Sequence, residues 1–183
     1  MATWNIDPVH SEVTFKVKHL VISTVTGSFK KFSGKVESDK EDFSDARVQL
    51  NIDVASVDTG NEHRDGHLKS ADFLDVANHP NITFVSNQIT KKGDSSYELR
   101  GDFTIRGITK TVNLQVEFGG IQKDFYGNTV AGFEITSKVN RMEFGLHWNG
   151  ITEAGGIVVS DEVRLFANVE LVKEVPVAAT ATA

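Results

Sequence analysis

The sequence predicts a closed antiparallel β-barrel of about eight strands, with a short helix capping one end. First, apolar and polar residues alternate in many short runs, as in strands that have one buried face and one face in water. Second, turn signals that contain glycine or asparagine separate these runs. Third, no segment predicts a long helix. Because an open sheet of many short strands would expose its edges, we expect the sheet to close.

The first predicted strand follows a turn at Asp7-Pro8. Its polar face carries glutamate, threonine and lysine, and its other face carries Val13, Phe15, Val17 and His19. A histidine therefore ends an otherwise apolar face. It is either a hydrogen-bonded core histidine or a polar anchor for a molecule held inside the barrel.

The remaining strands are expected at residues 27–37, 46–54, 82–90, 96–106, 110–118, 129–139 and 161–173. The segment Phe29-Lys30-Lys31-Phe32 breaks the alternation of the first of these, which indicates a β-bulge. Residues 61–71 are polar and follow the capping-type sequence Asp58-Thr59-Gly60-Asn61, so they predict the short helix. We expect one domain over residues 1–174 and a disordered tail over 175–183.

Composition excludes several classes of protein. The chain has no cysteine, which excludes a disulfide framework and a thiolate metal site. A net charge of -6 argues against nucleic-acid binding. No apolar run approaches the ~20 residues that a transmembrane helix needs. No signal peptide is visible, so we expect a cytoplasmic protein as written, or a periplasmic one if a signal peptide was removed.

A series of motifs runs along the chain and is specific when the motifs are taken together. They are Trp4-x-x-Asp7-Pro8-x-His10-Ser11, Arg64-Asp65-x-His67-Leu68, His79-Pro80-x-Ile82-Thr83-Phe84, Gly101-Asp102-Phe103-Thr104-Ile105-Arg106-Gly107, Asn140-Arg141-Met142-Glu143-Phe144-Gly145 and Ser160-Asp161-Glu162-Val163. From Trp4 to about Lys173 the chain resembles the YceI-like family of lipid- and polyisoprenoid-binding proteins. The resemblance implies a lipocalin-like barrel, a long-chain lipid ligand and a homodimer.

Inward-facing side chains are the candidates for a ligand cavity. A barrel of about eight strands either fills its interior with side chains or leaves room for one small ligand. Small residues at Gly101, Ala131, Ser137 and Ala167 would leave a tunnel lined by large ones, although ordinary core packing is the alternative. The predicted lining residues are Phe15, Val17, His19, Phe29, Phe32, Phe84, Phe103, Ile105, Phe118, Phe133, Ile135, Phe144 and Trp148.

Charged residues around the predicted helix have two interpretations. We expect a structural network of ion pairs made by Arg64, Asp65, His67, Asp72, Asp75 and Arg141. The alternative is a metal site that uses His63, His67 and His79, since an i, i+4 histidine pair can chelate zinc from one helix face. We expect no metal and no cofactor.

These observations favour a binding protein over an enzyme. The chain has no Gly-x-Ser-x-Gly elbow, no Ser-His-Asp order and no phosphate-binding glycine loop. We expect non-enzymatic binding and carriage of a polyisoprenoid, an isoprenoid quinone or a fatty-acid-like lipid, a ligand class that comes from the family resemblance. A metal-binding barrel enzyme and a solid barrel that acts as a structural or partner-binding module remain the alternatives.

Overall fold

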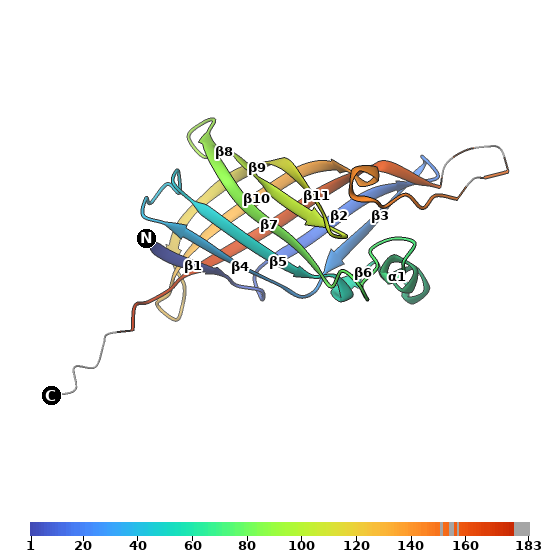
Figure 1. The fold of residues 1–183 in the computed structure, drawn as a ribbon. Coiled ribbons are helices and arrows are strands. Elements are labelled where there is room, and N and C mark those ends of the chain that lie inside the picture. The colour runs from blue at the N-terminus through green and yellow to red at the C-terminus, as the bar shows by residue number, and fades with distance from the viewer. Residues whose placement is uncertain (151, 154–155, 157, 178–183) are drawn as a thin grey trace.

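The predicted alternation builds the strands of a barrel wall in the computed structural model, which describes residues 1–150, 152–153, 156 and 158–177 (Figure 1). The strands are β1 (Ala2–Ile6), β2 (Glu12–His19), β3 (Ser23–Phe29), β4 (Phe32–Ser38), β5 (Arg47–Asp53), β6 (Val57–Asp58), β7 (Asn81–Lys91), β8 (Ser96–Ile105), β9 (Ile108–Lys123), β10 (Thr129–Asn140) and β11 (Val159–Lys173). Short 3₁₀ helices cover Val54–Ser56 and Arg141–Phe144. The predicted tail lies partly outside the described residues.

Antiparallel pairing closes the wall. β1 pairs with β4 on one side and with β11 on the other, which completes a ring of eight strands in the order β1-β4-β5-β7-β8-β9-β10-β11. At the opposite end of the barrel, β2 replaces β1 beside β11, and β3 and β6 extend the sheet. The predicted closed antiparallel barrel is thus confirmed.

The predicted strand over residues 27–37 is wrong, because the structure has two strands there. β3 ends at Phe29 and β4 begins at Phe32. Between them, the Lys30 and Lys31 amides donate to the Ser56 carbonyl and hydroxyl oxygens at 3.1 and 3.0 Å. The chain leaves the ladder at the predicted irregularity because Ser56 satisfies both amides.

Strand β1 was not predicted, since it is short and only Trp4 in it is buried. Its corner with β2 is fixed to β11. The Asp7 amide donates to the Glu170 carbonyl at 2.9 Å, and the Glu170 amide donates to the Ser11 hydroxyl oxygen at 2.9 Å. His10 Nδ1 lies 2.8 Å from Asp7 Oδ2, while Asp7 Oδ1 accepts from the Val9 amide.

This corner should make stability depend on pH. The hydrogen bond from His10 lowers the pKa of Asp7 below 3.8, and the same bond raises the pKa of His10 above 6.5. The stability that Asp7 contributes is lost as the pH falls through the pKa of Asp7 in the folded protein. The stability that His10 contributes is lost as the pH rises through the pKa of His10 in the folded protein. We expect the melting temperature of wild type to exceed that of Asp7→Asn most between pH 3.8 and 6.5. A difference that is constant over this range and above it would contradict the assignment.

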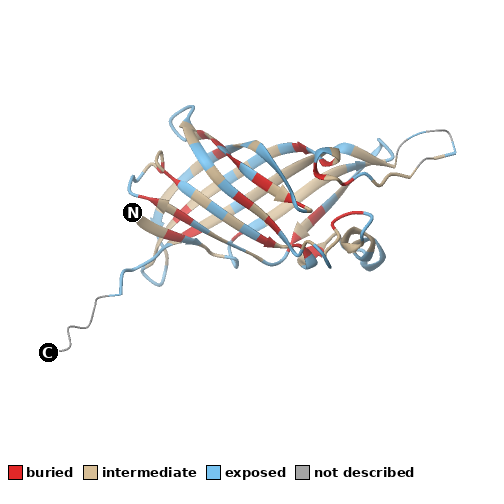
Figure 2. Cartoon of the chain, viewed as in Figure 1, coloured by how far each residue is buried: buried red, intermediate tan, exposed pale blue. Residues whose placement is uncertain are grey.

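An aromatic plug fills the end of the barrel where the N-terminus lies (Figures 1 and 2). Phe43, in the β4–β5 loop, is buried and places its ring centroid 5.0 to 5.4 Å from those of Trp4, Phe118 and Phe133. Phe118 and Phe133 stack on each other at 5.1 Å. Phe43 brings a loop side chain into the interior, so this end of the barrel is packed solid.

The predicted helix, α1 (Glu62–Lys69), lies beside the opposite end (Figure 1). Asn61 is its N-cap, and the Asn61 side-chain oxygen accepts from the Arg64 amide at 3.0 Å. No residue of α1 is fully buried, although Leu68 packs against the barrel core. No helix in the described part of the chain is both long and apolar enough to span a membrane.

Candidate ligand-binding cavity

The half of the barrel next to α1 contains a cavity of about 190 Å³ with an almost wholly apolar wall. For comparison, an engineered apolar cavity of about 150 Å³ stays dry and binds benzene. The lining residues come from β2, β3, β5, α1, β7–β11 and the segments that follow α1 and β10. They are Val13, Thr14, Phe15, Val17, Phe29, Leu50, Ile52, Leu68, Phe73, Leu74, Ile82, Phe84, Phe103, Ile105, Leu114, Ile135, Val139, Arg141, Leu146, Val159, Val163, Leu165, Phe166 and Ala167.

The structure divides the predicted lining residues into two groups. Those in the wall of the cavity are Phe15, Val17, Phe29, Phe84, Phe103, Ile105 and Ile135. Their contact with a ligand stays a prediction. Those that do not line it are His19, Phe32, Phe118, Phe133, Phe144 and Trp148.

Residues of the second group face inward or lie at the mouth, but they lie above or below the cavity along the barrel axis, or behind its wall. Phe118 and Phe133 belong to the plug at the far end. Phe144 is buried behind the wall, with its ring 5.8 Å from that of Phe103. His19 ends β2 opposite Val159, at the rim, and a polar contact between it and a ligand remains a prediction.

Small residues open less space than expected, because aromatic rings lie over two glycines. A Cβ atom added to Gly101 would lie 2.5 Å from Phe84 Cζ and 2.5 Å from the Val85 carbonyl oxygen. At Gly27, an added Cβ would lie 2.2 Å from Phe15 Cζ. The space above Gly101 is therefore filled by Phe84, whereas Ala167 does face the cavity.

We expect Gly101→Ala to lower the free energy of unfolding by ~1–3 kcal/mol, because the methyl group must displace both a cavity-wall ring and a backbone oxygen. Gly66→Ala is the matched control, since a Cβ there meets nothing within 4 Å and alanine favours the helix by up to ~1 kcal/mol. Urea unfolding measures both. An unchanged stability in Gly101→Ala would show that Phe84 can move aside freely.

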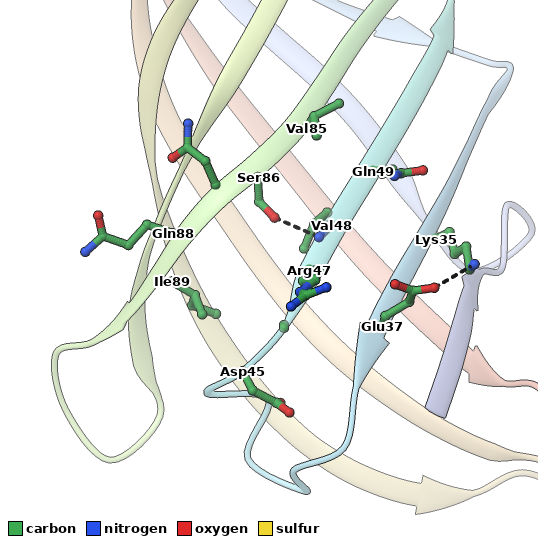
Figure 3. A pocket seen from close by; sticks show the side chains of 12 residues that line it. Lys35, Glu37, Asp45, Arg47, Val48, Gln49, Val85, Ser86, Gln88 and Ile89 are labelled. Atoms are coloured by element: carbon green, nitrogen blue, oxygen red, sulfur yellow. Dashed lines mark hydrogen bonds and ion pairs between the residues drawn. The ribbon is translucent and has the colours of Figure 1, made fainter. Parts of the chain in front are cut away.

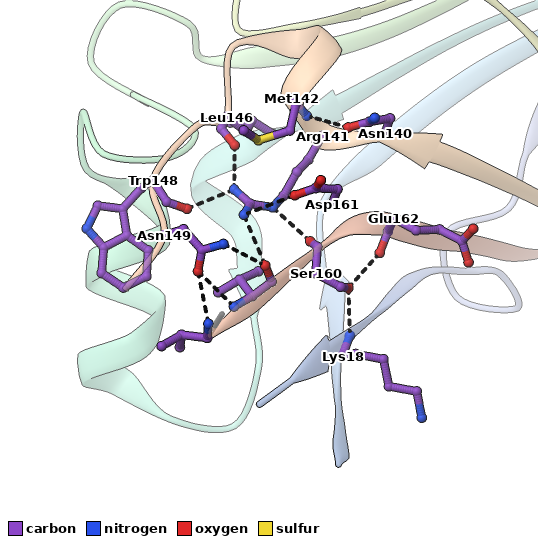
Figure 4. Close-up of polar contacts among 12 residues, drawn as sticks. Lys18, Asn140, Arg141, Met142, Leu146, Trp148, Asn149, Ser160, Asp161 and Glu162 are labelled. Atoms are coloured by element: carbon purple, nitrogen blue, oxygen red, sulfur yellow. Dashed lines mark hydrogen bonds and ion pairs between the residues drawn. The ribbon is translucent and has the colours of Figure 1, made fainter. Parts of the chain in front are cut away.

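Arg141 is the charged residue in the cavity wall, and only 3% of it is exposed. Its Nε donates to the Ser160 carbonyl at 2.8 Å, and one terminal nitrogen donates to the carbonyls of Leu146 and Trp148 (Figure 4). The other terminal nitrogen donates to the Val159 carbonyl at 3.2 Å. Arg141 thus joins the segment after β10 to the start of β11.

Burial lowers the pKa of the Arg141 guanidinium, and the carboxylate of Asp161, 3.9 Å away, opposes that shift. Arginine nevertheless remains charged at neutral pH. Its positive charge is therefore met mainly by carbonyl dipoles rather than by a close carboxylate.

Three aromatic rings cover the mouth beside α1. His67, Phe73 and Trp148 lie in mutual contact, with ring centroids 4.7 to 5.2 Å apart. His67 Nε2 also lies 2.9 Å from Asp72 Oδ2, which fixes the imidazole. Phe73 reaches the cavity itself, so this group links the cavity wall to the surface.

The charged residues predicted to form one network make separate local contacts. The Arg64 guanidinium and the Asp65 carboxylate both bind Thr59. The Asp75 carboxylate accepts from the Asn78 side chain at 3.0 Å. With the His67–Asp72 pair and the carbonyl contacts of Arg141, these are independent supports of the loops around the mouth.

The metal site suggested by His63, His67 and His79 is not assembled, since the ligand atoms of these residues do not gather at one point. Within the described ranges, three potential metal ligands come together at Asp7, His10 and Glu170, whose ligand atoms lie within 4.8 Å of one another. Two of the three side chains already bond to each other on the β1–β2 corner, with His10 Nδ1 2.8 Å from Asp7 Oδ2.

A second hollow, of about 410 Å³, lies outside the barrel over β4, β5 and β7 (Figure 3). Its floor is polar: the Val48 amide donates to the Ser86 hydroxyl oxygen at 2.8 Å, and Lys35 pairs with Glu37 at 2.8 Å. These four groups satisfy one another, and the rest of the lining mixes charged and amide side chains with aliphatic ones, so the hollow lacks the continuous apolar wall of the interior cavity.

Comparison with known proteins assigns the fold to a family. The model of the YceI-like domain matches residues 4–171 of this chain. The chain belongs to the YceI-like family. A UPF0312 protein of Staphylococcus epidermidis is 36% identical over 171 residues, which cover 93% of this chain and 97% of the relative. A UPF0312 protein of Staphylococcus aureus is 37% identical over the same shares of the two chains.

Solved structures of the same barrel include BcnA of Burkholderia cenocepacia, with a TM-score of 0.78 and 27% identity, covering 90% of this chain and 98% of that one. The YceI protein of Campylobacter jejuni gives a TM-score of 0.73 and 31% identity, over 86% and 90% of the two chains. A domain of Saccharophagus degradans described as polyisoprenoid-binding gives a TM-score of 0.70, over 93% and 98%. At 16% identity, the last likeness concerns the fold alone.

Proposed function

We propose that this YceI-like protein binds the apolar chain of an isoprenoid or similar long-chain lipid in its barrel and carries it without chemical change. The observation that carries the proposal is the apolar cavity beside α1. Membership of the YceI-like family supports the choice of ligand class, and a barrel of the same fold in Saccharophagus degradans is described as polyisoprenoid-binding.

The size of the cavity limits how much of the ligand it encloses. Pockets for small molecules typically measure ~300–1,000 Å³, whereas this cavity measures about 190 Å³. A long chain would therefore bury one end beside Phe84 and Leu165 and leave through the mouth near Trp148, or would displace wall side chains. Each buried methylene contributes ~0.8 kcal/mol, so even a short enclosed segment gives useful affinity.

Native mass spectrometry tests the proposal. Purified protein is stripped with organic solvent, refolded, and incubated with a series of prenyl alcohols of increasing length. We expect a one-to-one adduct whose stability rises with chain length and then levels off when the cavity is full. An empty barrel that forms no adduct with any member of the series would overturn the proposal and favour a solid structural module.

A further inference from the structure

The tip of the β2–β3 hairpin has an unusual sequence for its backbone. Leu20 and Val21 both have positive φ, 52° and 64°, and the Ile22 amide donates to the His19 carbonyl at 3.2 Å. Positive φ at both central residues is the pattern of a type I′ turn, which strongly favours Asn-Gly. A β-branched valine in this conformation is a genuine outlier.

This strained turn exposes aliphatic side chains to water. The exposed fractions of Leu20, Val21 and Ile22 are 38%, 70% and 85%. Single exposed apolar residues are normal, but a contiguous exposed group marks an interaction site more often. Three such residues in succession, at a turn where polar residues would be more stable, indicate that the tip contacts an apolar partner.

The tip lies at the mouth of the cavity. Its Leu20 amide donates to the Val158 carbonyl at 2.9 Å, and His19 pairs with Val159, which lines the cavity. Figure 1 shows β2 and β3 meeting at the same end of the barrel as α1. An apolar ligand that leaves the cavity therefore emerges beside the exposed tip.

Positive charge lies behind the tip on the outer wall. Lys138 of β10 is directly opposite Arg164 of β11, and Arg164 is directly opposite Lys16 of β2. Like charges directly opposite each other are unfavourable in a sheet. In the part of the chain that the structure describes, no carboxylate lies within 4.0 Å of these three cations, although Glu162 is on the same face of β11. Lys18 is exposed and lies closer to the tip.

We infer that the β2–β3 tip inserts into the surface of an anionic lipid bilayer and so places the cavity mouth against the membrane. Amphipathic helices bury their apolar face ~5–10 Å into the membrane interface, and we expect the three-residue tip to reach a similar depth. Lys18 is three residues from Val21, at most roughly 10 Å along the chain, so it would meet the lipid headgroups. The Lys16–Arg164–Lys138 row would follow close behind. Because the chain as a whole is acidic, with a net charge of -6, its attraction to an anionic surface would depend on local positive charge such as this row.

The inference rests on the proposed function, because a carrier of water-insoluble lipid must exchange its ligand with a membrane. Co-sedimentation with phosphatidylcholine vesicles, with and without phosphatidylglycerol, tests it. We expect wild type to bind the anionic vesicles, and to bind them less at high salt. Leu20→Asn/Val21→Gly/Ile22→Ser should lose at least tenfold in binding.

The triple substitution supplies the favoured Asn-Gly turn, so its melting temperature should equal or exceed that of wild type, which separates lost docking from lost folding. Phe125→Ser/Tyr126→Ser is the matched control, since those exposed aromatics occupy the β9–β10 turn at the other end of the barrel. It should bind vesicles as wild type does.

Three results would overturn the inference. These are wild type that does not bind anionic vesicles, a triple variant that binds them as well as wild type does, and vesicle binding that is lost in the control variant and kept in the triple variant. Wild type that is a dimer and becomes monomeric in the triple variant would assign the tip to a second copy of the chain. Uptake of a short prenyl alcohol without vesicles is measured in parallel. If uptake persists while docking fails, the proposed function stands and only the docking is overturned.

Discussion

Ala167→Phe is expected to weaken binding of a prenyl alcohol by about a hundredfold. Ala167 lies in the cavity wall on β11, on the same face as Val163 and Leu165, so a phenyl ring there occupies space that the ligand would fill. If the ring displaces about four methylene groups, the loss is ~3 kcal/mol, or roughly two powers of ten in affinity. Fluorescence titration with a labelled prenyl probe measures the effect.

Asn168→Phe is the matched control, because it adds the same ring one residue further along β11 on the outer face. It should bind the probe as wild type does. Both variants should keep a cooperative unfolding transition. Undiminished binding in Ala167→Phe would remove this cavity from consideration as the ligand site.

Arg141→Met should lower the free energy of unfolding by about 3–5 kcal/mol. Methionine fills much of the same volume but leaves the carbonyls of Leu146, Trp148 and Ser160 without their donor, whereas the Val159 carbonyl keeps the Asn149 amide at 3.0 Å. Each buried acceptor left unsatisfied costs ~1–3 kcal/mol, and solvent can reach some of them.

Arg141→Lys should fall between wild type and Arg141→Met, since an ammonium restores the charge but cannot reproduce the planar guanidinium fork. Chemical denaturation of the three proteins compares them. A loss below about 1 kcal/mol in Arg141→Met would mean that the segment after β10 is held in place by its apolar contacts instead.

Alternation along the sequence gives the side of the wall on which a residue lies, but not its height in the barrel. On β8, which the sequence predicts at residues 96–106, every second residue from Tyr97 to Ile105 is buried. Yet Phe103 lines the cavity, whereas the Tyr97 hydroxyl donates to the Asp42 carbonyl at the plug. Six residues of strand span roughly 20 Å. Height depends on register between strands, which no single strand encodes.

Residues supplied by loops were also beyond prediction. Phe43 closes one end of the barrel from a loop with no periodic pattern and with positive φ. Phe73 likewise enters the cavity from a segment without a periodic pattern, the turn after α1. By contrast, Val163, Leu165 and Ala167 alternate along the predicted strand over residues 161–173, and their place in the wall follows from that pattern.

Photo-crosslinking with a prenyl probe that carries a diazirine at the end of its apolar chain tests the central claim most directly. The chain terminus should label cavity residues such as Phe84, Ile135 and Leu165, and a soluble prenyl alcohol should compete with the labelling. Labelling confined to the outer hollow around Arg47 and Gln88, or labelling that no competitor reduces, would contradict a ligand held inside the barrel.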